Sequence, residues 1–299
     1  MSEDTLQGNA PNPPRSDRPD PMIPMDDLAA QYAVVPDKSF RYCPGCGLGM
    51  AQSAILRAFH RLQLDPSKVA TTGGSGCYAI MAHYFKSNHH HGSHGRGCAV
   101  ATGMKLARPE LTVITLQGDG DLLSIGGNHF IHAARRNLDI TVICFNNFGY
   151  GDTGGQYAAT TPAGSITDTS PYGMPEEPFD PCQLAIGAGA SFAARSTVAH
   201  PVHLTRVISE AIAWKGFAFV EVLQHCHVLW GRRNGMPEAM DMILHYKENA
   251  VHNRPGLDDE DKAGKFVLGV LHREARPEFG EHYARLRERV QSGELRSAR

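Results

Sequence analysis

The sequence lacks any apolar segment long enough to cross a bilayer. Its uninterrupted apolar runs are short, about the length of Tyr78–Ala82, whereas a membrane-spanning helix needs roughly 20 apolar residues. The first residues do not combine a basic segment with an apolar stretch, which is the pattern of a secretory signal. We therefore expect a cytoplasmic protein with no membrane partner.

An excess of charge of either sign is also missing. The 299 residues include 29 Lys and Arg against 31 Asp and Glu. No stripe of basic residues alternates with aromatic ones, as happens on nucleic-acid-binding surfaces. Nucleic acid is therefore not an expected partner, and the length is compatible with one large α/β domain or two ordinary ones.

Seven cysteines are present, an odd number that does not suit a framework of disulfides. Their spacing indicates metal binding or catalysis instead. Cys43 and Cys46 form a Cys-Pro-Gly-Cys knuckle that directs two thiolates into one site. Cys77 follows the glycine-rich loop 73–76, and Cys226 follows a predicted strand, so these two are the best candidates for the remaining ligands.

The other three cysteines suit structural positions. Cys144 lies in an apolar strand, Cys182 begins a predicted helix, and Cys98 precedes a small apolar helix. By spacing alone, the four candidate ligands fit structural zinc and an iron–sulfur cluster equally well.

The middle of the chain alternates apolar strands with helical segments. Strands are expected at Leu111–Leu116, Ile140–Phe145 and Phe217–Leu223, and helices at Ala51–Leu62, Ser124–Arg136 and Arg206–Trp214. Apolar strands separated by helices are typical of a parallel sheet covered on both faces. We predict an α/β fold with a doubly wound, mostly parallel sheet and a ligand site beyond the carboxyl ends of its strands.

The two ends of the chain differ from this middle part. Six prolines among the first 24 residues predict an extended or disordered arm over 1–38. The α/β domain would occupy 39–255. A charged helical extension is expected over 256–299, with amphipathic helices at Phe266–Arg273 and Glu281–Gln291.

The strongest motif comes after the first predicted strand of this middle part, in the turn Gly118-Asp119-Gly120-Asp121. The next strand ends in Asn146-Asn147, thirty residues after Gly118 counted inclusively. In a βαβ unit these two strand ends can meet at one edge of the sheet. Asp119, Asn147 and a carbonyl near Gly149 could then bind Mg²⁺ through oxygen atoms, while the glycines leave backbone N–H groups for a diphosphate.

An isolated Gly-Asp-Gly is usually only a turn, but the preceding strand, the spacing and the paired asparagines favour a cofactor site. No phosphate-loop lysine is present, so the metal would neutralise much of the phosphate charge. The arrangement resembles the thiamine-diphosphate signature of transketolases, decarboxylases and 2-oxoacid oxidoreductases. Beside such a cofactor, the cysteines favour a redox cluster over zinc, because an oxidised intermediate needs an electron acceptor.

Longer stretches between Tyr42 and Val251 resemble the β subunit of 2-oxoacid:ferredoxin oxidoreductases. They are Tyr42–Gly47, His94–Arg96, Ala101–Ala107, Gly118–Asp121, Ile125–Phe130, Asn146–Gly151, Thr153–Gln156 and Thr160–Pro162. The run from Cys226 to Gly235, with Met240–Met242 and Lys247–Asn249, is most similar to the 2-oxoglutarate branch. The family implies oxidative decarboxylation of a 2-oxoacid with coenzyme A, with electrons passing to ferredoxin.

The resemblance also implies roles for single residues. One 4Fe–4S cluster would be held by Cys43, Cys46, Cys77 and Cys226, and Mg²⁺ by Asp119, Asn147 and the Gly149 carbonyl. Thiamine diphosphate would be lined by Ser75, Gly76, Cys77, Tyr78, His94, Gly118, Asp119, Gly120, Asp121, Asn147, Gly149, Gly151 and Asp152. The activating glutamate is expected from a partner α subunit, so the chain should act as an αβ dimer or (αβ)₂.

The sequence departs from the pattern of this family at two positions. Gly154 stands where some relatives have a lysine, and His227 where relatives often have proline. The same chemistry on pyruvate or branched-chain 2-oxoacids is an alternative, as is a thiamine-diphosphate decarboxylase or carboligase with structural zinc. A non-catalytic metal-binding protein would leave the Asp119–Asn147 pairing unexplained.

Histidines gather near the glycine-rich loop, at His83, His89, His90, His91 and His94. A metal site and an exposed polar loop are both compatible with the three consecutive histidines. His94 differs because it belongs to a stretch that matches the family.

Overall fold

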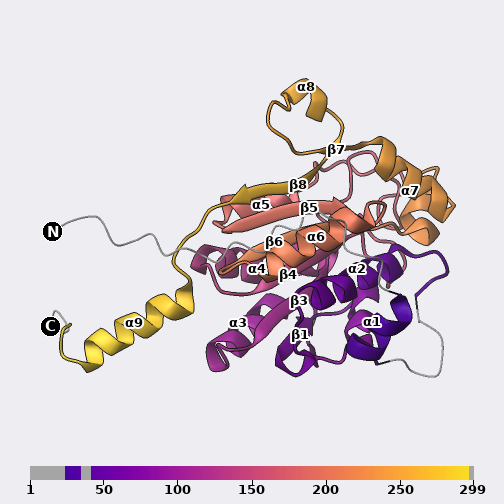
Figure 1. The fold of residues 1–299 in the computed structure, drawn as a ribbon. Helices are drawn as coiled ribbons and strands as arrows, with labels where there is room; N and C mark the ends of the chain where they lie inside the picture. The colour runs from indigo at the N-terminus through magenta and orange to yellow at the C-terminus, as the bar shows by residue number, and fades with distance from the viewer. Residues whose placement is uncertain (1–23, 35–41, 296–299) are drawn as a thin grey trace.

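The computed structural model describes residues 24–34 and 42–295 (Figure 1). Its central sheet has the strand order β2-β1-β3-β4-β6-β5-β8-β7. The strands are β1 Val69–Gly73, β2 Asn88–His91, β3 Thr112–Gly118, β4 Thr141–Asn146, β5 Phe192–Thr197, β6 Ala218–Leu223, β7 Ala250–His252 and β8 Phe266–Arg273. Neighbouring strands run parallel except β5 and β8, which confirms the predicted mostly parallel α/β sheet.

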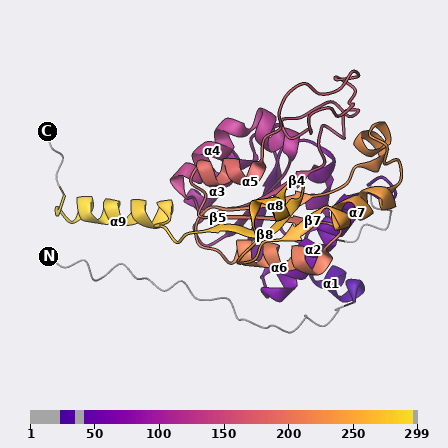
Figure 2. The ribbon, with the colours of Figure 1, turned by 90° about the horizontal axis from the view of Figure 1, so that it is seen from above.

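Helices cover both faces of the sheet (Figure 2). One layer contains α1 Met25–Tyr32, α2 Gly47–Arg61, the 3₁₀ segment η2 Cys77–Tyr84 and α6 Pro201–Ile212, and the other contains α3 Gly97–Ala107, α4 Gly127–Arg136 and α5 Pro181–Gly187. The shorter or more peripheral elements are η1 Pro66–Lys68, the π-helical turns η3 Gly120–Ile125 and η4 His227–Gly231, and the helices α7 Ala239–Glu248, α8 Asp259–Lys262 and α9 Phe279–Gln291. The predicted helix over Ser124–Arg136 is therefore interrupted, because η3 ends at Ile125 before α4 begins.

The packing of the core on both faces of the sheet explains the continuous apolar run in β4. Val142 and Cys144 pack with α3, α4 and α5, while Ile143 and Phe145 pack with α2 and α6 on the opposite face. Successive side chains of a strand point to opposite faces, so a strand covered on both sides needs apolar residues throughout. Each such fully buried side chain contributes about 1.5–3 kcal/mol to folding.

The predicted N-terminal arm is wrong for residues 25–32, which form α1. Leu28 and Tyr32 are one turn apart on this helix and almost fully buried against α2. Their four-residue spacing gives the short helix an apolar face that can join the core. The remaining residues of the predicted arm lie largely outside the described part of the chain.

The predicted helix over Phe266–Arg273 is also wrong, because these residues form β8. This strand pairs antiparallel with β5 and parallel with β7, so part of the predicted C-terminal extension belongs to the central sheet. The β-branched residues Val267 and Val270 suit a strand, and Leu268 is fully buried in it. The helix expected at Glu281–Gln291 is confirmed as α9, which projects from the sheet in Figure 1.

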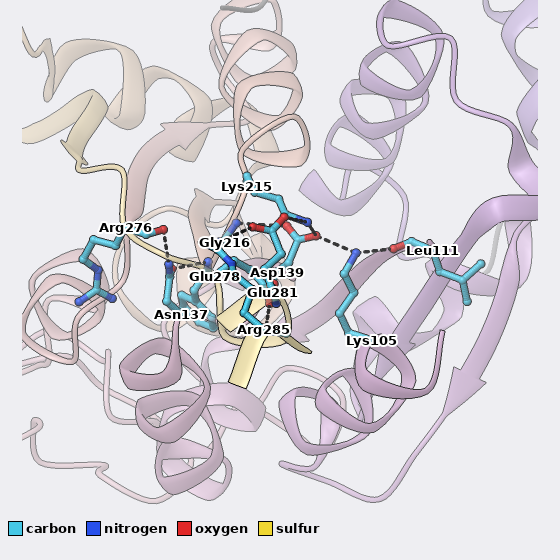
Figure 3. A network of polar contacts seen from close by, with 12 residues as sticks. Lys105, Leu111, Asn137, Asp139, Lys215, Gly216, Arg276, Glu278, Glu281 and Arg285 are labelled. Atoms are coloured by element: carbon cyan, nitrogen blue, oxygen red, sulfur yellow. Dashed lines mark hydrogen bonds and ion pairs between the residues drawn. The ribbon is translucent and has the colours of Figure 1, made fainter. Parts of the chain in front are cut away.

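A polar network fastens the chain at the amino ends of β4 and β6 (Figure 3). Asp139 lies between Lys105 of α3 (2.7 Å) and Lys215 after α6 (3.1 Å), and it accepts a hydrogen bond from the backbone N–H of Gly216. Asn137 donates to the carbonyls of Arg276 and Pro277, just before α9. These contacts hold the edge of the sheet that lies opposite the carboxyl ends of its strands.

No helix in residues 24–34 or 42–295 is long and apolar enough to cross a membrane.

Candidate cofactor site

A cavity lies at the carboxyl ends of β1, β3, β4 and β6. All of the residues that the sequence predicted for the cofactor line it: Ser75, Gly76, Cys77, Tyr78, His94, Gly118, Asp119, Gly120, Asp121, Asn147, Gly149, Gly151 and Asp152. The segments meet there because β3 and β4 are parallel neighbours, with Gly118 opposite Phe145. The structure thus brings together residues that lie as much as 77 positions apart.

Five further residues, to which the sequence assigned no cofactor role, also line the cavity: Leu48, Phe145, Tyr150, Thr153 and Gln224. Gln224 directly follows β6, so the rule that ligands bind beyond strand ends could have identified it. Leu48 carried no such signal, because it is an ordinary buried residue of the first turn of α2.

Three oxygen-bearing groups converge where β3 and β4 end. With its amide nitrogen turned inward, Asn147 donates to the Gly149 carbonyl (2.7 Å) and to Asp119 Oδ1 (3.2 Å), and its oxygen accepts from Gln224 Nε2 (3.0 Å). With the amide oxygen inward, three oxygens face one another, an arrangement that is favourable only around a cation. Gln224 Oε1 is buried without a partner among the described residues, so it can turn to accept from Asn147. This donor set fits Mg²⁺.

Asp119 is almost fully buried, and burial raises the pKa of its carboxyl to about 7. The Thr160 hydroxyl donates a hydrogen bond to its Oδ2. A bare carboxylate is costly at such a depth, whereas a bound divalent cation would favour its charged form. The electrostatics of the site therefore agree with the role of a metal ligand.

Asp121 shapes the loop that faces the cavity. Its carboxylate accepts hydrogen bonds from the backbone N–H of Gly95 and the amide of Gln117, and it contacts the ring of His94. Gly74 must be glycine here, because a Cβ would lie only 2.3 Å from Asp121 Oδ1. These contacts fix the orientation of His94 and leave its second ring nitrogen available.

Of the four candidate cysteines, Cys77 lines the cavity and Cys226 lies close to it. A Cβ on Gly151 would lie 3.6 Å from Cys226 Sγ and 3.9 Å from Cys77 Sγ. His225 ties the knuckle to the segment after β6, because its Nε2 lies 2.6 Å from the carbonyl oxygen of Gly45 and its own carbonyl accepts from the N–H of Gly47. Cys43 and Cys46 are thereby held next to Cys226.

Burial raises the pKa of the Cys46 thiol to about 11 and that of Cys77 to about 12. Asp152 adds to the shift of Cys77, since its carboxylate oxygen lies 3.7 Å from the sulfur. Both thiols would therefore be protonated at neutral pH without a positive partner, and a metal ion would be needed to stabilise them as thiolates.

The other cysteines take no part in this arrangement. Cys98, Cys144 and Cys182 are each buried within the second core layer, as expected for small structural side chains.

A buried ion-pair network supports the end of β4. Glu221 of β6 binds Arg195 of β5 (2.6 Å), and Arg195 also binds Asp180 (2.7 Å). The other oxygen of Glu221 accepts from the amide of Asn146 (2.8 Å), whose own oxygen accepts from the N–H of Phe148 (3.1 Å). The network thus sets the turn that carries the neighbouring Asn147.

We expect Arg195→Met to lower the free energy of unfolding by about 3–5 kcal/mol, because it leaves the carboxylate of Glu221 buried without a charged partner. Urea denaturation of the cofactor-free chain would measure this change. The double variant Arg195→Met/Glu221→Gln removes both charges and should recover part of the loss. Equal stability of the wild type and the single variant would show that the pair does not support this turn.

Comparisons with known proteins agree with the geometry of this site. Residues 74–222 match the family model described as thiamine pyrophosphate enzyme, C-terminal TPP binding domain. Among named relatives, the 2-oxoglutarate synthase subunit KorB of Methanocaldococcus jannaschii is 44% identical over 253 residues, which cover 84% of this chain and 94% of the relative. The corresponding subunit of Archaeoglobus fulgidus is 42% identical and covers 85% and 92%.

A solved structure gives the same result. The 2-oxoglutarate:ferredoxin oxidoreductase from Magnetococcus marinus, with 2-oxoglutarate, coenzyme A and succinyl-CoA bound, superposes with a TM-score of 0.79. It is 31% identical and covers 88% of this chain and 90% of its own. The chain therefore belongs to the thiamine-diphosphate-binding 2-oxoacid:ferredoxin oxidoreductases, as a β subunit.

Proposed function

We propose that this chain is the β subunit of a 2-oxoglutarate:ferredoxin oxidoreductase, which converts 2-oxoglutarate and coenzyme A to succinyl-CoA and carbon dioxide and passes two electrons to ferredoxin. The main support is one arrangement: the oxygen site of Asp119, Asn147 and Gly149 lines the same cavity as Cys77, and Cys226 lies next to Gly151 of this lining. The relatives named above, whose substrate is 2-oxoglutarate by name, support the choice of 2-oxoacid.

Thiamine diphosphate, when bound, would supply the carbon nucleophile that allows a 2-oxoacid to release carbon dioxide. Asp119, Asn147 and the Gly149 carbonyl would hold the Mg²⁺ that neutralises the diphosphate. Gly120 allows the ring of Tyr150 to pack against this loop, because a Cβ there would lie 2.6 Å from that ring. Tyr78 and Phe145 stack with their ring centroids 6.1 Å apart and give the cavity wall an aromatic surface.

The spacing of the cysteines favours a 4Fe–4S cluster over zinc. In tetrahedral zinc sites with Zn–S bonds of about 2.3 Å, the sulfurs lie roughly 3.8 Å apart. Across residues 24–34 and 42–295, no three sulfurs of Cys43, Cys46, Cys77 and Cys226 lie within 4.8 Å of one another. A polynuclear cluster accepts a wider frame of thiolates than a single ion does.

The acids around the cavity support a partner subunit. Within the described residues, the acidic side chains that line it are Asp119, Asp121 and Asp152, and none is a glutamate. Glu221 lies nearby but is bound to Arg195 and Asn146. A carboxylate that activates the cofactor would then come from an α subunit, in an αβ or (αβ)₂ assembly in the cytoplasm.

The substrate assignment predicts an order of rates. The chain, co-expressed with its α subunit and purified without oxygen, should reduce ferredoxin or a viologen dye faster with 2-oxoglutarate than with pyruvate or a branched-chain 2-oxoacid, each at equal concentration with coenzyme A. Comparison of kcat/KM for these substrates is the measurement. A higher value for pyruvate would refute the 2-oxoglutarate assignment while leaving the family and the cofactor site unchanged.

A further inference from the structure

Three histidines outside the cavity meet at the edge of the sheet. His89 and His91 lie on the edge strand β2, two residues apart and so on the same face. His83 lies in the last turn of η2, which packs beside this strand. One ring nitrogen from each of the three lies within 4.8 Å of the other two.

His89 is oriented as metal-binding histidines are. Its Nδ1 lies 3.1 Å from the hydroxyl of Thr71, and this hydroxyl lies 3.4 Å from the carbonyl of Asn88, to which it can donate. Thr71 then accepts from Nδ1–H, which leaves Nε2 with a lone pair. That Nε2 is buried and has no hydrogen-bond partner among the described residues, an arrangement that is costly unless something binds it.

We propose that His83, His89 and His91 form a binding site for a divalent transition-metal ion of the zinc type, separate from the magnesium and the cluster. Imidazole nitrogens suit zinc, copper and nickel ions, and three histidines leave a fourth position for water. Thr71 would act as the outer partner that fixes the ring of His89, as metal-binding histidines usually require.

The geometry allows this with small movements. Zinc–nitrogen bonds of about 2.0–2.1 Å in a tetrahedron place the nitrogens roughly 3.3 Å apart. His83 and His91 are exposed and can rotate their rings, while the half-buried His89 is fixed by Thr71. Exposure of the two outer rings also gives an ion access from solvent.

The site would join two segments that pack side by side. It would tie the end of η2 to β2, and η2 begins with Cys77 and Tyr78, which line the cofactor cavity. Because binding to the folded state stabilises it, the bound ion should hold this segment in place. The inference is independent of the substrate and of the identity of the cluster.

Equilibrium dialysis against Zn²⁺ tests the proposal on the cluster-loaded αβ complex, purified through a tag without histidine. The wild type should bind one more zinc equivalent than His83→Ala or His91→Ala. The matched control is His90→Ala, which alters an exposed histidine on the same strand. This control should bind as much zinc as the wild type. Thr71→Val should keep the equivalent but weaken its affinity by about 10- to 100-fold.

Cobalt distinguishes this site from the cysteines. Co²⁺ added to the wild type should give a d–d absorption without a sulfur-to-cobalt charge-transfer band, and His91→Ala should lose that absorption. Zinc should also raise the thermal midpoint of the wild type but not that of His91→Ala. Equal zinc stoichiometry in the wild type, His83→Ala and His91→Ala would overturn the proposal. A cobalt spectrum with thiolate bands alone would also overturn it.

Discussion

Asp119→Asn should remove almost all thiamine-diphosphate-dependent activity while leaving the fold intact. The amide keeps the shape of the side chain and can still accept from Thr160, but it removes the only negative charge among the three groups at the proposed magnesium site. Truncating one partner of a buried charge pair costs about 2–5 kcal/mol, which is roughly a 30- to 4,000-fold loss of affinity for the magnesium diphosphate. Titration of the αβ complex with thiamine diphosphate at fixed Mg²⁺ measures this loss.

Glu110→Gln provides the matched control for Asp119→Asn. It also removes one carboxylate charge, but at an exposed ion pair with Arg108 on the far side of β3 from the cavity. This control should bind the cofactor as the wild type does. If Asp119→Asn kept wild-type affinity, Asp119 could not be a ligand of the metal.

Cys226→Ala should eliminate ferredoxin reduction and most of the bound iron. A cluster that loses one of four thiolates loses both a bond and part of the negative charge that holds it. The cavity itself should persist, because Asp119, Asn147 and Gly149 are not altered, so thiamine diphosphate should still bind. Iron content, the absorbance of the cluster and ferredoxin reduction can be measured on the same anaerobic preparation.

Cys98→Ala tests whether the effect is specific to the cluster. Cys98 is buried in the second core layer, and its sulfur contacts Gln117 rather than any of the four candidate ligands. This variant should keep its iron and its ferredoxin reduction, with some loss of stability from the missing sulfur. Normal iron content in Cys226→Ala would exclude Cys226 as a ligand.

The sequence was sufficient to predict the strand-end geometry, for a physical reason. A parallel βαβ unit places the carboxyl ends of its strands at one edge, so Asp119 and Asn147 could be paired from spacing alone. The turn that brings Cys43 and Cys46 together is set by the residues between them, so it could also be predicted. Features that depend on backbone topology and short-range turns were therefore accessible.

Features that depend on packing between segments far apart in the sequence could not be predicted. The segment Phe266–Arg273 has apolar residues that also fit an amphipathic helix, and only the free edge of β5 makes it a strand. The Arg195–Glu221 pair joins two strands whose order the sequence does not reveal. Likewise, only the pairing of β1 with β2 sets His89 beside Thr71 and brings His83 within reach of it.

The most direct test is the amount of iron, acid-labile sulfide and thiamine diphosphate per β chain in an αβ complex prepared without oxygen. We expect about four iron and four sulfide together with one thiamine diphosphate, since the proposed magnesium ligands line the same cavity as Cys77 and Cys226 lies close by. Zinc in place of iron, or iron in a chain that cannot bind the diphosphate, would contradict a shared site for decarboxylation and electron transfer.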